Sequence, residues 1–165
     1  MPETPASLSA LHEQHHAALR ELLFQTLERL VVVDRVGAIH CFEQFVVEIN
    51  DGLALEEDLV MPCYRLHGPT QGAGKPEIVD GDHVILRRGI ESVLAFVNEP
   101  ADLRTILEGL PHVYRLIGTL EHHTERERRH VYPLVEEHIS ATARNSVIDG
   151  LRRILGHLVD SGAAR

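Results

Sequence analysis

Ionisable side chains stand inside apolar stripes of the predicted helices, and this placement restricts how the chain can fold. Between residues 113 and 134, apolar side chains recur at helical spacing, and His123 and Glu127 lie inside that stripe. Residues four apart share one face of a helix, so both side chains should point into the core. Burying such groups is costly unless they satisfy one another or bind a metal ion. The fold must therefore bring ionisable groups together inside the protein.

Three other predicted helices each carry one ionisable residue in an apolar stripe. His16 continues the leucine stripe of the first helix, Glu56 interrupts that of the second, and His83 begins that of the third. A single inward histidine is usually a hydrogen-bonded core residue. Imidazole and carboxylate together, however, suit iron, zinc or manganese, and helical bundles build such sites from facing helices. With His123 and Glu127 these residues are the candidate metal ligands, and the alternative is a buried polar network without metal.

Apolar periodicity divides the chain into long helical blocks. Hydrophobic residues make up 44% of the chain and aromatic residues only 4%, which favours helices packed through leucine and valine. The predicted main helices lie within about residues 5–140, and a short helix follows at about 142–160. The one obvious long connection, rich in glycine and proline, starts at Gly68. We expect an all-α, up-down four-helix bundle with a short additional C-terminal helix, in a single domain over residues 1–165.

The two halves of the chain resemble each other. The segment "HAALRELL" from His16 aligns with "HVILRRGI" from His83, and "EEDLVMP" from Glu56 aligns with "ERRHVYP" from Glu127. In each of the latter two segments, a valine follows the first glutamate by four residues and a proline follows it by six. Each half is therefore predicted to be a helical hairpin with one histidine early and one glutamate late.

Charge and composition exclude several classes of protein. The net charge of −9 disfavours binding to the phosphate backbone of nucleic acids. No run reaches the roughly 18 apolar residues of a membrane span, and the N-terminal stretch lacks the apolar region of a signal peptide. Cys41 and Cys63, if one helix carries both, lie about 33 Å apart, too far for a disulfide. We expect a soluble, cytoplasmic protein with reduced cysteines.

The polar positions resemble those of the hemerythrin-like (HHE cation-binding) family, whose members are four-helix bundles with a non-haem di-iron centre. Bacterial members often show one histidine on the first helix, HxxxE on the second, one histidine on the third and HxxxE on the fourth. The matching residues are His16, the segment "GLALE" ending at Glu56, His83, and the segment "HTERE" from His123 to Glu127. The resemblance covers roughly residues 8–140. It implies two non-haem iron ions at these residues, and a protein that binds or senses O₂ or a related small molecule.

Two positions depart from the family pattern. Gly52 stands where the second-helix motif needs its histidine, and Arg87, which cannot ligate, stands where the oxygen-carrying members have another histidine. Glu48 or Asp51 could supply an oxygen ligand instead, and His12, one turn before the first candidate histidine, could add a nitrogen. Gly52 could also leave space for water, a substrate or a displaced side chain. A site with fewer histidines favours chemistry or sensing over oxygen transport.

Other polar residues have more ordinary expected roles. His15 and His122 each precede a candidate ligand, point about 100° away from it, and are expected to make polar contacts outside the ligand set. If the predicted helical register is shifted by one residue, His15 would take the place of His16, or His122 that of His123, as a candidate ligand. Tyr132 is expected to pack in the core, and Tyr114 could donate to a bound oxygen species.

Three alternative functions stay open from the sequence. The first is an oxidase- or peroxidase-type enzyme at an open iron site. The second is a haem-binding variant, in which Gly52 gives the macrocycle room, although a C-x-x-C-H attachment motif is absent. The third is a metal-free interaction module that forms a homodimer through the C-terminal helix. The expected ligand is a small molecule such as O₂, with neither nucleic acid nor a membrane as partner.

Overall fold

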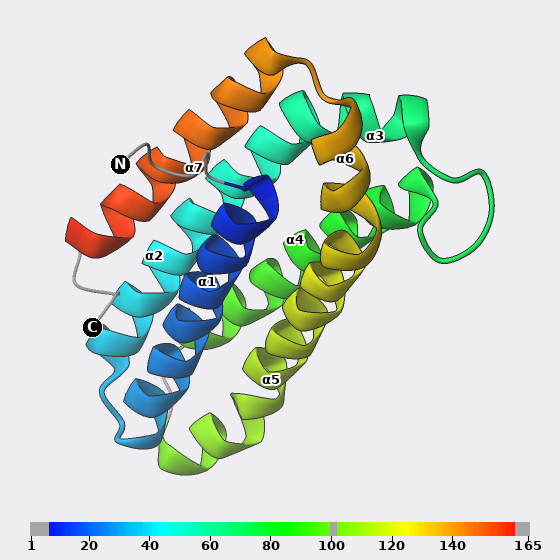
Figure 1. The fold of residues 1–165 in the computed structure, drawn as a ribbon. Coiled ribbons are helices and arrows are strands. Elements are labelled where there is room, and N and C mark those ends of the chain that lie inside the picture. Colours follow the sequence, from blue (N-terminus) through cyan, green and yellow to red (C-terminus); the bar gives the residue numbers. More distant parts are fainter. Residues whose placement is uncertain (1–6, 100–101, 161–165) are drawn as a thin grey trace.

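The computed structural model describes residues 7–99 and 102–160, and the long helices dominate it (Figure 1). The ends of the predicted domain therefore lie partly outside the described residues. The bundle consists of α1 (Leu8–Val31), α2 (Arg35–Leu55), the π-helix η1 (Glu56–Val60), α3 (Met61–His67), α4 (Pro76–Asn98), α5 (Leu103–Arg126), the π-helix η2 (Glu127–Val131) and α6 (Tyr132–His138). A separate helix, α7 (Ala141–Asp160), follows them.

The helices close into a four-membered ring. α1 packs beside α2 and α5, while α4 packs beside the same two helices on the other side (Figure 1). α3 and α6 continue α2 and α5 through the two π-helices, and α7 lies across the outside of α1 and α2. The predicted all-α four-helix bundle with an additional C-terminal helix is confirmed. In the described part of the chain, no helix is both long and apolar enough for a membrane crossing.

Side-chain caps set where the helices begin. Ser7 caps α1 by accepting from the amide of Ala10, and Asp34 caps α2 by accepting from the amide of Gly37 at 3.0 Å. The third main helix, α4, begins at Pro76. Proline fits the first turn of a helix because its fixed φ and missing N–H cost nothing there.

Each π-helix starts at a candidate ligand and ends just before a proline. η1 begins at Glu56 and precedes Pro62 by two residues, and η2 has the same relation to Glu127 and Pro133. A proline inside an α-helix removes one backbone hydrogen bond and collides with the carbonyl four residues earlier. The wider π turn relieves that collision, and such turns occur often at functional sites. The repeated Glu-to-Pro spacing in the sequence thus marks these turns.

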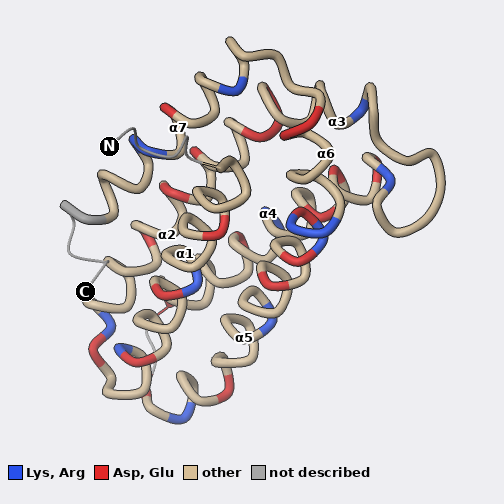
Figure 2. The backbone as a smooth tube through the Cα atoms, in the orientation of Figure 1, with Lys and Arg blue, Asp and Glu red and all other residues tan. Residues whose placement is uncertain are grey.

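A polar layer divides the core into two apolar clusters. The larger cluster fills the end of the bundle around Leu23, Phe45 and Ile90, and the smaller fills the end around Tyr64 and Val135. On every main helix the candidate ligands lie between residues of the two clusters. Acidic and basic residues are spread along the long helices (Figure 2).

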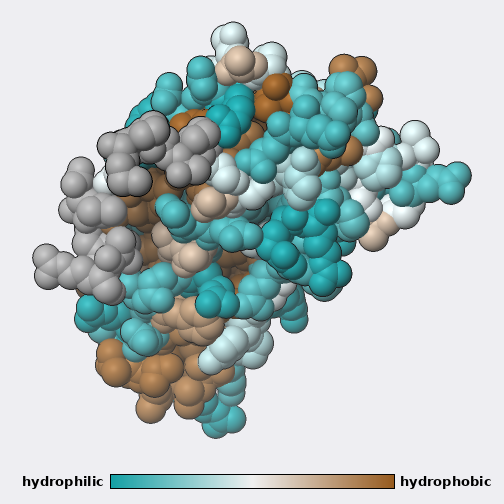
Figure 3. All heavy atoms as spheres, viewed as in Figure 1, coloured by the Kyte–Doolittle hydropathy of each residue, from teal (hydrophilic) through white to brown (hydrophobic). Residues whose placement is uncertain are grey.

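The turn between α1 and α2 exposes apolar side chains. Val31, Val32 and Val36 are all more than half exposed. Figure 3 shows an apolar patch at the end of the bundle where this turn lies in Figure 1. Val33 in this turn has a φ of 62°, a left-handed conformation that branched residues rarely adopt. This end lies far along α1 from the polar layer, so it takes no part in the candidate site.

Candidate metal centre

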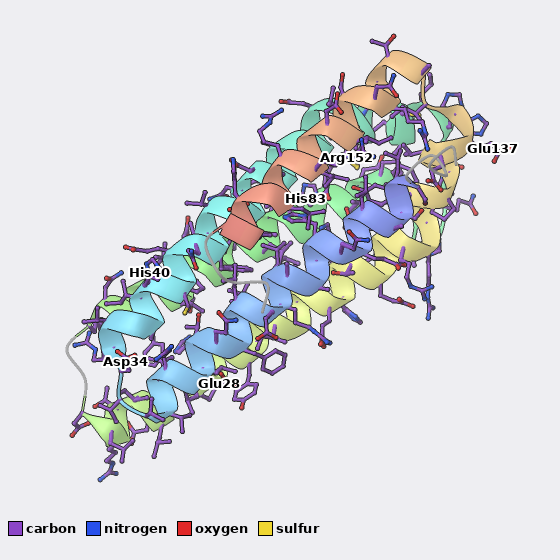
Figure 4. All side chains as sticks on the ribbon, turned by 60° about the vertical axis from the view of Figure 1, so that its left-hand side comes forward. Glu28, Asp34, His40, His83, Glu137 and Arg152 are labelled. Atoms are coloured by element: carbon purple, nitrogen blue, oxygen red, sulfur yellow. The ribbon has the colours of Figure 1, made fainter. Side chains whose placement is uncertain are left out.

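Six buried side chains meet in the polar layer. They form two overlapping groups, His12–His16–Glu56–Glu127 and Glu56–His83–His123–Glu127, and within each group the donor atoms lie within 4.8 Å of one another. All five residues predicted from the sequence belong to these groups. The sixth, His12, was weighed in the sequence as one of several candidates for the missing ligand, and it lies one helical turn before His16. Figure 4 shows His83 among the helices, while His40 and Glu137 project outward.

The two glutamates are shared by both groups, and their oxygens face the Nε2 atoms of the histidines. Oε1 of Glu56 lies 3.7 Å from His12 and 3.9 Å from His16. Its Oε2 lies 3.5 Å from His83 and 3.8 Å from His123. Each oxygen of this carboxylate therefore serves a different pair of histidines, as a bridging carboxylate would. We call the His12–His16 side the first position and the His83–His123 side the second position.

Glu127 faces both positions through one oxygen. Its Oε2 lies 2.7 Å from Nε2 of His12 and 3.8 Å from that of His16. The same atom lies 3.1 Å from Nε2 of His123. A metal ion at either position could therefore use this oxygen, so Glu127 is the second carboxylate that both donor groups share.

Carboxylates paired with arginines support the histidines of the second position. Nδ1 of His83 donates to Glu57 at 2.9 Å, and Arg87 contacts the same oxygen at 2.8 Å. On the other side, Nδ1 of His123 lies 3.9 Å from Asp82, which is ion-paired with Arg126. Such partners fix the ring orientation and raise the basicity of a ligand imidazole. Arg87, which departs from the family pattern, thus acts through Glu57.

The histidines of the first position have weaker support. Nδ1 of His16 donates to Oγ1 of Thr124 at 2.6 Å, and that hydroxyl donates to the Leu120 carbonyl at 2.7 Å. Nδ1 of His12 has no hydrogen-bond partner among the described residues. The ring of His12 packs on the ring of Tyr132, whose hydroxyl donates to Glu56 at 3.3 Å. The two positions therefore differ in how strongly their ligands are held and polarised.

Burial controls the protonation of the layer. It lowers the pKa of His12 well below the ordinary histidine value, and neighbouring His16 lowers it further, so the ring is neutral at neutral pH. Burial, together with the charge of Glu56, raises the pKa of Glu127 well above the usual glutamate value. Without metal, the layer therefore favours the protonated form of the Glu127 carboxyl. Neutral imidazoles and a displaceable carboxyl proton are what a divalent cation requires of its ligands.

Buried polar atoms of the layer lack partners within the described chain. Oε2 of Glu56, Nε2 of His83 and both ring nitrogens of His123 are buried and make no hydrogen bond there. Such groups normally find a partner, since each unsatisfied one costs about 1–3 kcal/mol. Of these atoms, the Nε2 atoms of His83 and His123 face Oε2 of Glu56 at 3.5 and 3.8 Å, which suits a shared cation, whereas Nδ1 of His123 faces Asp82. The donor set and its orphaned atoms therefore fit a metal site.

The other expected substitutes for the missing ligand lie elsewhere. Asp51 is exposed, and Glu48 is buried but does not belong to either donor group. The place of a side chain at Gly52 is taken by His15, because a Cβ atom there would lie 2.4 Å from Cε1 of the His15 ring. The displaced-side-chain alternative comes closest to this arrangement. The contact between helices could not be read from spacing along one helix.

His15 and His122 differ, although each precedes a ligand. His122 is exposed, whereas His15 is fully buried. Burial, with His16 beside it, lowers the pKa of His15 from 6.5 to about 3, opposed weakly by Glu56 and the Glu48 backbone. As expected, His15 belongs to neither donor group, and its hydrogen bond with the Glu48 backbone is a polar contact between α1 and α2. The helix face it shares with His12 explains its burial.

Comparison with known proteins agrees with the geometry. The family profile of the Hemerythrin HHE cation binding domain matches residues 7–135, which is most of the chain. No curated protein and no solved structure matches the chain significantly. The matched range contains both donor groups and the two π-helices. The chain therefore belongs to the hemerythrin HHE cation-binding family.

Proposed function

We propose that this protein binds two non-haem iron ions in the polar layer and uses them to bind or sense O₂ or a related small molecule. The observation that carries the proposal is the sharing of Glu56 and Glu127 by two histidine pairs. Two carboxylates between two pairs of imidazoles offer enough ligand atoms to hold two neighbouring cations. Mixed imidazole and carboxylate ligands suit iron, and the family resemblance points to the same metal.

The ligands and their neighbours have distinct tasks. His12 and His16 would hold one ion, His83 and His123 the other, and the two glutamates would bridge them. Glu127 would release its proton as the ions bind, because a carboxyl group must be deprotonated to bind a cation. Bound iron would supply the electrons and open coordination sites that binding of O₂ requires. The surrounding apolar clusters would keep bulk water away from the bound molecule.

A small cavity supports a small ligand. It lies between α1 and α5, has a volume of about 280 Å³, and reaches His16 and Thr124 at the edge of the first position. Its mouth is lined by exposed residues such as Glu13 and Arg20, so it connects the edge of the first position with solvent and would let a small ligand approach.

Tyr132 supports oxidase- or peroxidase-type chemistry as a second candidate function. Its phenol is fully buried, and its hydroxyl donates to the shared carboxylate of Glu56 at 3.3 Å. A phenol so placed can deliver a proton at the centre. Turnover of peroxide or of an oxidisable substrate by the iron-loaded protein, lost in Tyr132→Phe, would favour this candidate over simple binding.

The haem and metal-free alternatives have less support. The room that a macrocycle would need at Gly52 is taken by the His15 ring. A metal-free module would leave the buried atoms of the polar layer without partners, at the cost given above. An intense Soret band in the purified protein would favour haem, and unchanged thermal stability after chelation would favour the metal-free module.

The test is iron content per chain with the visible spectrum of freshly purified protein. We expect about two irons per chain in the wild type, by analogy with the two donor groups. His123→Ala and Glu127→Ala should each reduce iron to less than half of that content, since each removes a ligand. His122→Ala is the matched control, because its side chain is exposed next to a ligand, and it should keep full iron content. Unchanged iron in the first two variants would overturn the proposal.

A further inference from the structure

The two positions differ in whether their donor atoms are already hydrogen-bonded to each other. At the first position, Nε2 of His12 and Oε2 of Glu127 form a hydrogen bond of 2.7 Å, and both side chains are buried. A cation that uses both atoms must replace this hydrogen bond, because it binds to the lone pairs between which the proton now lies. Binding at the first position therefore starts from ligands that already satisfy each other.

The donor atoms of the second position have no such bond to give up. Nε2 of His83, Nε2 of His123 and Oε2 of Glu56 are buried, and none of them makes a hydrogen bond within the described residues. The two nitrogens face that oxygen at 3.5 and 3.8 Å. A cation held by these three atoms breaks no hydrogen bond and gives each atom a partner, which buried polar atoms normally have. The second position therefore gains more from an ion than the first.

The groups behind the ligands differ in the same direction. His83 donates from Nδ1 to Glu57, a carboxylate that also pairs with Arg87. His16 donates instead to the uncharged hydroxyl of Thr124. A carboxylate raises the basicity of a ligand imidazole more than a hydroxyl does, because its negative charge stabilises the positive charge that the ring acquires at a metal. The histidines of the second position are therefore the stronger ligands.

Access to solvent also distinguishes the two positions. The cavity between α1 and α5 is lined by His16 and by exposed residues that include Glu13 and Arg20. Neither His83 nor His123 lines this cavity. An ion at the first position would therefore border a route to solvent that does not reach the histidines of the second position.

We propose that the two positions fill in a fixed order, so that the second position binds its ion first and tightly while the first position exchanges its ion with solution. The inference rests on the proposed function, because it requires iron in the polar layer. It adds a regulation of that site, since the supply of ferrous iron then decides whether the protein carries one ion or two. At low iron the protein holds a single ion, at the second position.

The experiment titrates the full-length protein, freed of metal by chelation, with ferrous iron under anaerobic conditions and follows binding by calorimetry. We expect two steps in the wild type, the first at least about tenfold tighter than the second, as for other differences in the groups behind a ligand. His12→Ala and His83→Ala are a matched pair, because each removes one buried histidine from one position. The first variant should lose only the weaker step, and the second variant only the tighter step.

Two further variants keep all of the ligands and assign the steps if an alanine variant does not fold. Thr124→Val removes the hydroxyl behind His16 and should weaken only the weaker step. Glu57→Gln removes the charge behind His83 and should weaken only the tighter step. Both substitutions keep the size of the side chain, so a general loss of packing does not explain a selective effect.

The outcomes separate this inference from the proposed function. Two ions that bind with equal affinity, or together in one cooperative step, overturn the order but leave the two-iron function intact. Loss of the tighter step in His12→Ala, or its selective weakening in Thr124→Val, overturns the order as well. A wild type that binds one ion or none overturns the two-iron function and the order with it.

Discussion

The contact between Gly52 and His15 shows how one residue determines the packing of two helices. The missing side chain on α2 makes room for an imidazole from α1, with only 2.4 Å between its Cε1 and an added Cβ. Real side-chain atoms do not approach so closely, so any larger residue at this place must move the ring. The glycine is therefore required by its neighbour on another helix rather than by its own backbone.

Gly52→Ala should lower the free energy of unfolding by about 1–3 kcal/mol, the usual cost of overpacking a core. In a His15→Ala background the same change should cost much less, because the obstructing ring is gone. Urea denaturation of the four proteins in this double-mutant cycle measures the coupling. Gly118→Ala on α5 is the control, since nothing lies within 4 Å of its added Cβ, and it should be neutral or stabilising. Equal costs in both backgrounds would contradict the packing described.

Glu57 should control the affinity of the second metal position. Glu57→Gln keeps the size of the side chain but removes the charge that accepts from His83 and pairs with Arg87. We expect iron affinity at this position to fall about 10–100-fold. Anaerobic calorimetric titration of the metal-free protein with ferrous iron measures it. Glu125→Gln, whose partners are surface arginines, should bind iron normally, and equal losses in both variants would argue against a specific role.

The sequence indicates most of the site because helical spacing alone brings the ligands to one face. His16, His83 and the His123–Glu127 pair follow from that rule, as does Glu56. His15 does not follow, because its environment depends on which residue faces it across α1 and α2. Spacing along one helix carries no information about such a partner.

At the scale of the elements, the extents of the helices were predicted more closely than their internal geometry. The predicted long helical blocks and the C-terminal helix are confirmed by the helices from α1 to α7. The π-helices within them were not predicted, since five residues leave the apolar periodicity almost unchanged. The Glu-to-Pro spacing was visible in the sequence, and the conflict of proline with an α-helical backbone could have indicated these turns.

The start of α1 depends on a residue that lies far along the chain but packs beside it at the same end of the bundle. Glu136 in α6 accepts from the Ser7 hydroxyl at 2.8 Å, the Leu8 amide at 2.7 Å and the Ser9 hydroxyl at 3.2 Å. Glu136→Ala should lower the free energy of unfolding by about 1–3 kcal/mol, because these hydrogen bonds to a charged group are lost. Chemical denaturation tests this. The exposed neighbour provides the control: Glu137→Ala should change stability by less than about 0.5 kcal/mol.

For the whole molecule, the stability of the metal-free protein should depend on pH. His15 has a lowered pKa, about 3 in the fold against 6.5 in the unfolded chain. Its contribution is therefore complete above pH 6.5 and is lost as the pH falls toward 3, because only the unfolded chain takes up the proton. Between pH 7 and pH 5, chelated wild type should lose about 2 kcal/mol from this residue.

Comparison with His15→Phe isolates that contribution. The raised pKa of Glu127 acts with the opposite sign, since it weakens the metal-free fold as the pH rises above 4.5, but it is common to both proteins. Urea unfolding of the two chelated proteins at pH 7 and pH 5 provides the measurement. A parallel loss of stability in both would show that His15 does not control the acid response.

The polar layer also has a mechanical consequence. All four main helices cross it between two apolar clusters, so a bound cation pair is a cross-link at one height of the bundle. Without that cross-link, the two apolar clusters are separated by a layer of buried polar atoms that lack hydrogen-bond partners. Amide hydrogen exchange in the chelated protein should therefore be fastest on both sides of this plane, around the π-helices, and slow near Phe45. Local unfolding of the metal-free chain would then start at the polar layer in the middle of the bundle rather than at the ends of the helices.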